Sequence, residues 1–299
     1  MVYKETGAFG QLIVEQKEYV KELQNGINFS FNISDIKQIH QNKYVQKMKE
    51  DIKIIHKQAR TPFPSVVEEF IMTTKDMLIH LSEYMVRERC PVPKDVFIDM
   101  FKLFVRMCRL KPAPGSSWRS SCSINHKRVV SESDVVIMPR DDCKETNIVS
   151  VVSIAEVKNV SLYSSDAETE QGKTLVLGSS SSESLNNEKS VCSKPAIYER
   201  IPPQVLGQHG GGLLIHNSIY DNKLWKGRSE RYVPGMIVMG TRVIFTLLVL
   251  KYEHLVDLIQ GKDICGSHKS YIYYSEPKDI LHKADRDLLF ESFARLNYI

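Results

Sequence analysis

Apolar residues recur at helical spacing through the first third of the chain, where polar residues fill the intervening positions. This pattern predicts a mostly helical region over residues 11–110. Prolines at Pro62 and Pro91 divide it into separate helices, because proline cannot continue a helix from its interior. The last of these helices is predicted over Asp95–Leu110, with Met and Phe side chains forming its buried stripe.

After residue 110 the pattern changes to short apolar runs separated by polar turns, which is typical of strands. Two hairpins and a further short strand are predicted, together with a helix that Gly210–Gly212 weakens or ends and a closing helix. The predicted segments are strands at Arg128–Met138 and Ile148–Val157, a helix at Ile201–Ile215, strands at Met236–Met239, Val243–Leu250 and Tyr271–Tyr274, and a helix at Asp279–Leu296.

Residues 161–193 differ from both regions, because they are rich in Ser, Glu and Asn and poor in aromatic residues. Such a segment buries too little apolar surface to offset the entropy of ordering, so it is predicted to be a flexible insertion. The chain is therefore divided into an N-terminal helical region, 1–110, that packs on an α/β core, 111–299. The predicted fold class is α/β, with a mixed central sheet and flanking helices.

Composition narrows the class of protein only slightly. The 299 residues are 42% hydrophobic and 25% charged, with a net charge of +4, which permits nucleic-acid binding without indicating it. The six cysteines form no CxxC pair, which favours reduced thiols over a zinc site. The longest apolar run has about 8 residues, too few to cross a bilayer, and the polar first ten residues are not typical of a signal peptide. We therefore expect a nuclear or cytoplasmic protein that is neither secreted nor membrane-bound.

Three charged residues on the first predicted hairpin suggest chemistry. Asp134 lies in one strand, and Glu156 and Lys158 lie near the end of the other. Side chains alternate along a strand, so Glu156 and Lys158 share a face, and Asp134 joins them if the strands pair. Two carboxylates can hold Mg²⁺ or Mn²⁺, and a lysine nearby can assist an attacking water. Without metal the two carboxylates should repel each other.

An Asp on one strand followed about 20 residues later by Glu-x-Lys on the next resembles the PD-(D/E)xK nuclease superfamily, over roughly Asp95–Leu250. Ser133 stands where the motif has proline. The resemblance implies a restriction-endonuclease-like core in the order αβββαβ. It also implies a Gln on the helix that follows the Glu-x-Lys strand, and here Gln204 and Gln208 both fit. In some members a Glu comes from an earlier helix, for which the candidates are Glu83 and Glu88.

The resemblance implies a metal-dependent nuclease acting on DNA, with RNA as an alternative, in which Asp134 and Glu156 hold the metal and Lys158 and Gln208 complete the site. The competing hypothesis is a catalytically inactive protein of the same fold that binds nucleic acid or protein. Glu132, His126 and His209 are better interpreted as solvated or structural residues. A set of lysines that either tracks a phosphate backbone or forms a solvated helix face comprises Lys37, Lys43, Lys47, Lys49, Lys53 and Lys57. Oligomeric state is left open.

Overall fold

The computed structural model describes residues 14–32, 43–58, 64–87, 93–139, 151–158, 197–217, 229–263 and 266–296. The predicted flexible insertion at 161–193, the candidate Glu88 and the lysine at position 37 lie outside these ranges. Within them, no helix has the length and hydropathy needed to cross a membrane.

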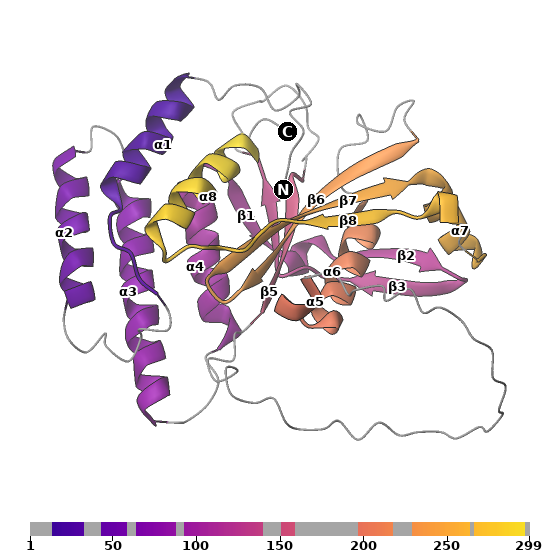
Figure 1. Ribbon diagram of the computed structural model, residues 1–299, viewed down its shortest axis with the longest axis horizontal. Coiled ribbons are helices and arrows are strands. Elements are labelled where there is room, and N and C mark those ends of the chain that lie inside the picture. The colour runs from indigo at the N-terminus through magenta and orange to yellow at the C-terminus, as the bar shows by residue number, and fades with distance from the viewer. Residues whose placement is uncertain are drawn as a thin grey trace, which may run out of the picture.

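Helices occupy the N-terminal third and then alternate with strands (Figure 1). The α-helices are α1 (Val14–Gly26), α2 (Lys43–Gln58), α3 (Pro64–Arg87), α4 (Lys94–Met107), α5 (Ile197–Arg200), α6 (Pro203–His216), α7 (Tyr252–Gln260) and α8 (Lys283–Leu296). The strands are β1 (Lys111–Pro114), β2 (Ser120–Ile124), β3 (Lys127–Ser131), β4 (Val135–Met138), β5 (Ser153–Lys158), β6 (Glu230–Met239), β7 (Arg242–Lys251), β8 (Tyr271–Tyr274) and β9 (Lys278–Asp279).

The main sheet has the order β1-β4-β5-β6-β7-β8, and β9 also pairs with β7. Among the strands that the structure describes in this sheet, β5 and β6 run parallel and the other pairs are antiparallel. A parallel pair needs a long crossover, and α5 and α6 lie within the one between β5 and β6. The protein therefore has the predicted α/β class with a mixed sheet.

Alternating side chains send the two faces of the sheet into different hydrophobic clusters. Val135, Ala155 and Val157 join the large cluster formed with α1 to α4 and α8, whereas Val136 and Ile154 pack with Leu213 of α6. Figure 1 shows the two layers, with α4 and α8 on one side of the sheet and α6 with the β2–β3 ribbon on the other. Glu156 and Lys158 share the period-2 register of Ile154, so they belong to the α6 side.

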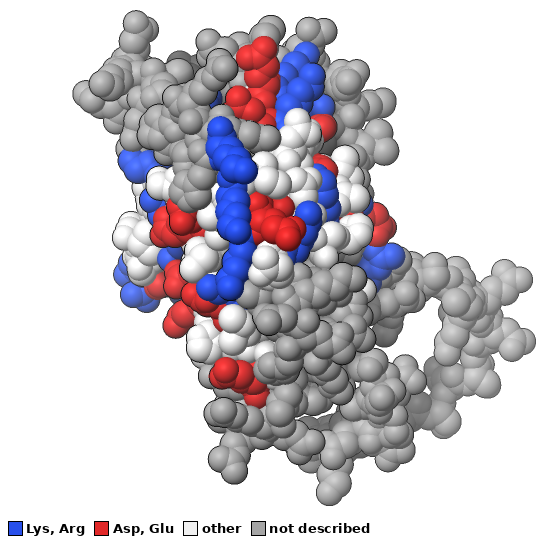
Figure 2. Space-filling model, turned by 90° about the vertical axis from the view of Figure 1, so that its left-hand side faces the viewer, with Lys and Arg blue, Asp and Glu red and all other residues white. Residues whose placement is uncertain are grey.

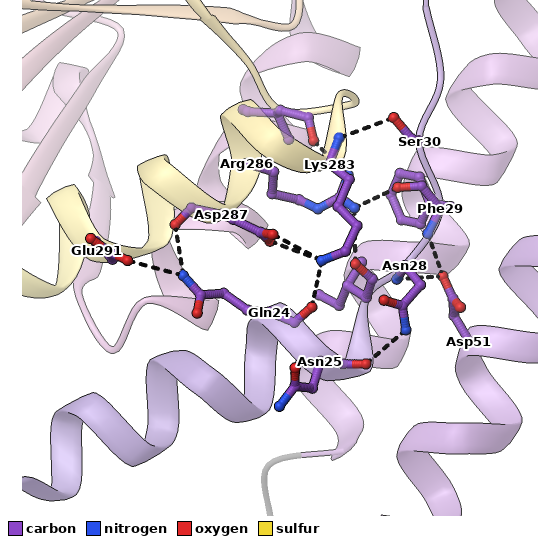
Figure 3. Close-up of polar contacts among 12 residues, drawn as sticks. Gln24, Asn25, Asn28, Phe29, Ser30, Asp51, Lys283, Arg286, Asp287 and Glu291 are labelled. Carbon is purple, nitrogen blue, oxygen red and sulfur yellow. Dashed lines mark hydrogen bonds and ion pairs between the residues drawn. The ribbon is translucent and has the colours of Figure 1, made fainter.

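A buried guanidinium joins the segment after α1 to the segment before α8 (Figure 3). Arg286 of α8 is fully buried and donates to four backbone carbonyls, two from each of two distant segments: Ile280 and Leu281, and Ile27 and Phe29. Its Cζ also lies 4.2 Å from the centre of the Phe29 ring.

Asp51 of α2 holds the same N-terminal segment from the opposite side. Its Oδ2 accepts the backbone N–H groups of Asn28 and Phe29 at 2.9 and 2.7 Å. The segment after α1 is therefore fixed between α2 and α8 by polar contacts that satisfy its backbone.

The predicted strand Arg128–Met138 is wrong as a single element, because the structure divides it between two sheets. Residues up to Ser131 pair with β2, and residues from Val135 pair with β1 and β5. The polar run Ser-Glu-Ser-Asp at 131–134 interrupts the alternation and provides the division. Gly115 fits closely against it, because a Cβ at that position would lie 1.4 Å from the Ser133 carbonyl oxygen.

Of the two outcomes predicted for Gly210–Gly212, an end of the helix is wrong, since α6 continues to His216. Burial of Leu206, Leu213 and Ile215 offsets the low helix propensity of glycine. Strand β1 was not predicted, because its Lys-Pro-Ala-Pro sequence is unfavourable in a sheet interior. The structure places β1 at the sheet edge, where proline is tolerated.

Candidate functional site

Asp134 lies immediately before β4 and is fastened to β5 by two hydrogen bonds. Its backbone N–H donates to the Ala155 carbonyl at 3.2 Å, and its Oδ2 accepts the backbone N–H of Val157 at 2.7 Å. Val135 pairs with Ala155 in the strand register, and Asp134 is the residue before it, so its carboxylate lies at the end of the β4–β5 pairing. The pairing of β4 with β5 thus places Asp134 beside the strand that carries Glu156 and Lys158.

Glu156, Lys158 and Gln208 form the next part of the site. Lys158 Nζ lies 2.7 Å from Glu156 Oε1 and donates to Gln208 Oε1 at 2.9 Å. The first contact links two residues on the same face of β5, and the second links the sheet to α6. The ammonium of Lys158 therefore has two oxygen partners that limit where it can lie.

Lys94, which the sequence analysis did not select, completes the cluster from α4. Its Nζ lies 2.5 Å from Asp134 Oδ1. The signal for it in the sequence is weak, because its carboxylate partner is 40 positions away. Only the packing of α4 on the sheet, through residues such as Phe97 and Phe101, brings this first residue of the helix to Asp134.

The formal charges of this cluster balance, with two carboxylates (Asp134, Glu156) and two ammonium groups (Lys94, Lys158). The expected repulsion between the carboxylates is therefore offset by one cation on each. All four side chains are partly exposed, which screens these interactions. We name Asp134, Glu156, Lys158, Gln208 and Lys94 the Asp134 cluster.

The donor set of the Asp134 cluster suits a hard divalent cation. In the described residues, no three His, Cys, Asp or Glu side chains gather in a way that could hold a metal ion. Mg²⁺ needs fewer, since it commonly binds through one or two carboxylates and keeps several waters. Asp134 and Glu156 are thus residues that could hold Mg²⁺ or Mn²⁺ with water as the remaining ligands.

Of the alternatives predicted for the site, Gln208 contacts Lys158 and Gln204 does not. Gln204 lies exposed one turn earlier in α6, about 6 Å away along the helix axis. Glu83 is exposed on α3 and makes no hydrogen bond or ion pair with the Asp134 cluster among the described residues. Glu132 is exposed next to the bend.

The two histidines considered from the sequence lie in different surroundings. His126 is exposed in the β2–β3 turn, with a positive φ of 59°. His209 is buried, and its Nε2 shares a hydrogen bond of 2.7 Å with Thr246 Oγ1. Burial lowers the pKa of His209 to about 4, so the ring is neutral at pH 7. This geometry makes His209 a packing residue between α6 and β7.

Four lysines of α2 are exposed to solvent: Lys47, Lys49, Lys53 and Lys57. Lys49, Lys53 and Lys57 are exposed and spaced by four residues, so they follow one side of the helix. Figure 2 shows a column of basic side chains with acidic ones beside it. This mixed surface is compatible with either earlier interpretation, and a role in phosphate binding stays a prediction.

A cavity of about 280 Å³ lies apart from the Asp134 cluster, beside β7, β9 and the start of α8. Arg242, Asp279, His282 and Asp285 contribute charged or polar groups to its wall. Asp279 lies 3.9 Å from Arg242, and Asp285 lies 3.3 Å from Lys278. None of the residues predicted for the site lies in its wall, so we assign it no chemistry.

No family model, curated protein or solved structure matches this chain. The interpretation of the Asp134 cluster therefore depends on its own geometry and on the resemblance of its motif.

Proposed function

We propose that this protein is a metal-dependent phosphodiesterase that acts on DNA as a nuclease. The observation that supports the proposal is that Lys158 contacts both Glu156 and Gln208, while Asp134 is bonded to the same strand through the Val157 N–H. Gln208 makes this contact although it is 50 positions from Lys158.

The order of elements supports the same proposal. Leaving out the β2–β3 ribbon and the short α5, the elements from α4 to β6 follow as α4, β1, β4, β5, α6 and β6. This is the αβββαβ order that the resemblance implies, with the helix after the Glu-x-Lys strand contributing the glutamine.

The residues of the cluster have distinct roles in the proposed reaction. Asp134 and Glu156 hold the metal, which supplies Lewis-acid polarisation of a phosphodiester oxygen and of an attacking water. Lys158 places a cation beside the reacting phosphate and can exchange a proton with water. Gln208 orients Lys158 by accepting one of its N–H groups, which leaves its other N–H groups for Glu156 and substrate.

One observation favours the inactive binding protein as a second candidate. Each carboxylate already carries an internal ammonium partner, so the cluster is electrically complete without metal. A protein that only binds nucleic acid or protein could keep such pairs for stability. The two candidates differ in what they predict for cleavage.

A plasmid-nicking assay with the full chain tests the proposal, in Mg²⁺, in Mn²⁺ and in chelator. We expect cleavage only with metal, and losses of at least about 100-fold for Asp134→Asn and for Lys158→Ala, because both remove groups of the reacting centre. Lys127→Ala, an exposed lysine of β3, is the matched control and should cut at the parent rate.

Melting temperatures measured in parallel separate loss of chemistry from loss of folding. If the folded parent protein does not cut DNA with either metal, the nuclease proposal is wrong and the binding protein becomes the better interpretation. Equal rates for the parent and Lys158→Ala would remove Lys158 from the reaction.

A further inference from the structure

We infer that Lys94 is an internal counter-ion of Asp134 that a divalent metal ion must displace, so that this lysine sets the metal concentration at which the site fills. The inference rests on the proposed function, since it concerns the same carboxylate. It adds a residue from α4 that neither the Asp…Glu-x-Lys motif nor the resemblance assigns.

The contacts of the Asp134 carboxylate show where competition occurs. Oδ2 accepts the backbone N–H of Val157, which leaves Oδ1 as the oxygen that faces a cation. The ammonium of Lys94 lies 2.5 Å from this Oδ1. A metal ion that binds Oδ1 takes the same side of the carboxylate, and two cations cannot share that position without strong repulsion.

The position of Lys94 in its helix points to the same role. Lys94 is the first residue of α4, where the helix dipole disfavours a cation. Pro93 is the N-cap residue and makes no side-chain cap, and the ammonium of Lys94 only donates, so it cannot accept the free N–H groups of the first turn. The ion pair with Asp134 is the favourable interaction that offsets this unfavourable position in the helix.

Lys94 is also held more loosely than the second lysine of the cluster. Lys158 has two oxygen partners, Glu156 Oε1 and Gln208 Oε1, whereas Lys94 has the single carboxylate of Asp134 among the described residues. The side chain of Lys94 is 35% exposed, and its flexible stem can carry the ammonium into water. Metal binding therefore displaces Lys94 and leaves Lys158 in place.

Isothermal titration calorimetry of the full chain with MnCl₂ tests this without any cleavage. Lys94→Met removes the competing charge and keeps an unbranched side chain, so its Kd for Mn²⁺ should fall by up to about fivefold, the range expected for one partly exposed ion pair. Lys94→Arg keeps the charge and should stay near the parent Kd.

Lys102→Met is the matched control for a change in net charge. Lys102 also lies on α4, is 30% exposed and pairs at 3.9 Å with Asp99, away from the sheet. Its Kd for Mn²⁺ should equal that of the parent. The double variant Lys94→Met/Asp134→Asn should lose the tight binding, which ties the effect to this carboxylate.

The possible outcomes distinguish the role of Lys94 from the proposed metal site. Equal Kd values for the parent and Lys94→Met would overturn the role of Lys94 and leave the proposed function standing. An equal gain in Lys102→Met would also overturn it, because net charge alone would then explain the effect. If neither the parent nor Lys94→Met binds Mn²⁺, the metal site itself is wrong and the inference falls with it. Binding by Lys94→Met alone would support the inference most strongly.

Discussion

The guanidinium of Arg286 and the ammonium of Lys94 both connect parts of the chain that are far apart in sequence, but in different environments. Arg286 is fully buried and donates to four carbonyls, including Ile27 and Phe29, 259 and 257 positions away. Lys94 is one-third exposed and has one carboxylate partner, Asp134. If Arg286 is removed, water does not reach the buried carbonyls that it bonded. If Lys94 moves away from Asp134, water can solvate the ammonium and another cation can pair with the carboxylate.

This difference separates a structural charge from an exchangeable one. A buried cation with several fixed acceptors stabilises the fold because its removal leaves polar groups unpaired. A partly exposed ion pair contributes little to stability, so a ligand that competes for one of its partners can replace it at little cost to the fold. The two residues are therefore expected to respond differently to substitution. Replacing Arg286 should change the free energy of unfolding, whereas replacing Lys94 should change the Kd for a divalent metal ion.

Arg286→Met should have the largest effect on stability. The substitution keeps an unbranched chain but removes the Arg286 donors of the Ile27, Phe29 and Ile280 carbonyls, at about 1–3 kcal/mol for each group that stays unpaired. The Leu281 carbonyl still accepts the backbone N–H of Phe31. We expect the free energy of unfolding to fall by at least about 3 kcal/mol in urea denaturation. A loss below about 1 kcal/mol would contradict the structural role of Arg286.

A buried residue that is neutral in the folded state sharpens the comparison. Burial lowers the pKa of His209 to about 4, while an unfolded histidine titrates near its ordinary value of 6.5. Between these two pH values the unfolded chain binds a proton that the folded chain does not, so stability falls as the pH drops through this window. The total loss from this residue is about 3 kcal/mol.

Unfolding free energies at pH 7 and pH 4.5 for the parent and His209→Gln measure this contribution. Glutamine can still bond to Thr246 but does not titrate, so the variant should lose less stability on acidification than the parent. The same pH dependence in both proteins would show that His209 is not the group responsible.

The smallest effect is expected at Lys283, which lies close to Arg286 in Figure 3 but is partly exposed. Its Nζ contacts Asp287 at 2.9 Å and the Gln24 carbonyl at 2.6 Å. Lys283→Ala should lower the unfolding free energy by about 1 kcal/mol or less, because water can replace both contacts. A loss as large as that of Arg286→Met would mean that burial is not what distinguishes the two residues.

The candidate site shows how far sequence reasoning could go. Asp134, Glu156 and Lys158 could be predicted from the sequence because strand alternation is a local property, and Glu156 and Lys158 are two residues apart. Gln208 was assigned to the site with Gln204 kept as an alternative, since both fit the same helix face, and only the position of α6 along β5 shows which of them contacts Lys158. Lys94 was missed because its partner lies on another element, 40 positions away in the sequence.

By itself the sequence determined the helical N-terminal third, the α/β class, the β6–β7 hairpin and the strand that carries Glu156 and Lys158, because periodic burial is written into neighbouring residues. Only the tertiary structure divided 128–138 between two sheets, continued α6 through three glycines and placed β1 at the sheet edge. It alone also paired Lys94 with Asp134 and surrounded Arg286 with carbonyls from both ends of the chain. These features depend on which elements pack together and in what register, and that is decided by the sum of many distant contacts rather than by any local pattern.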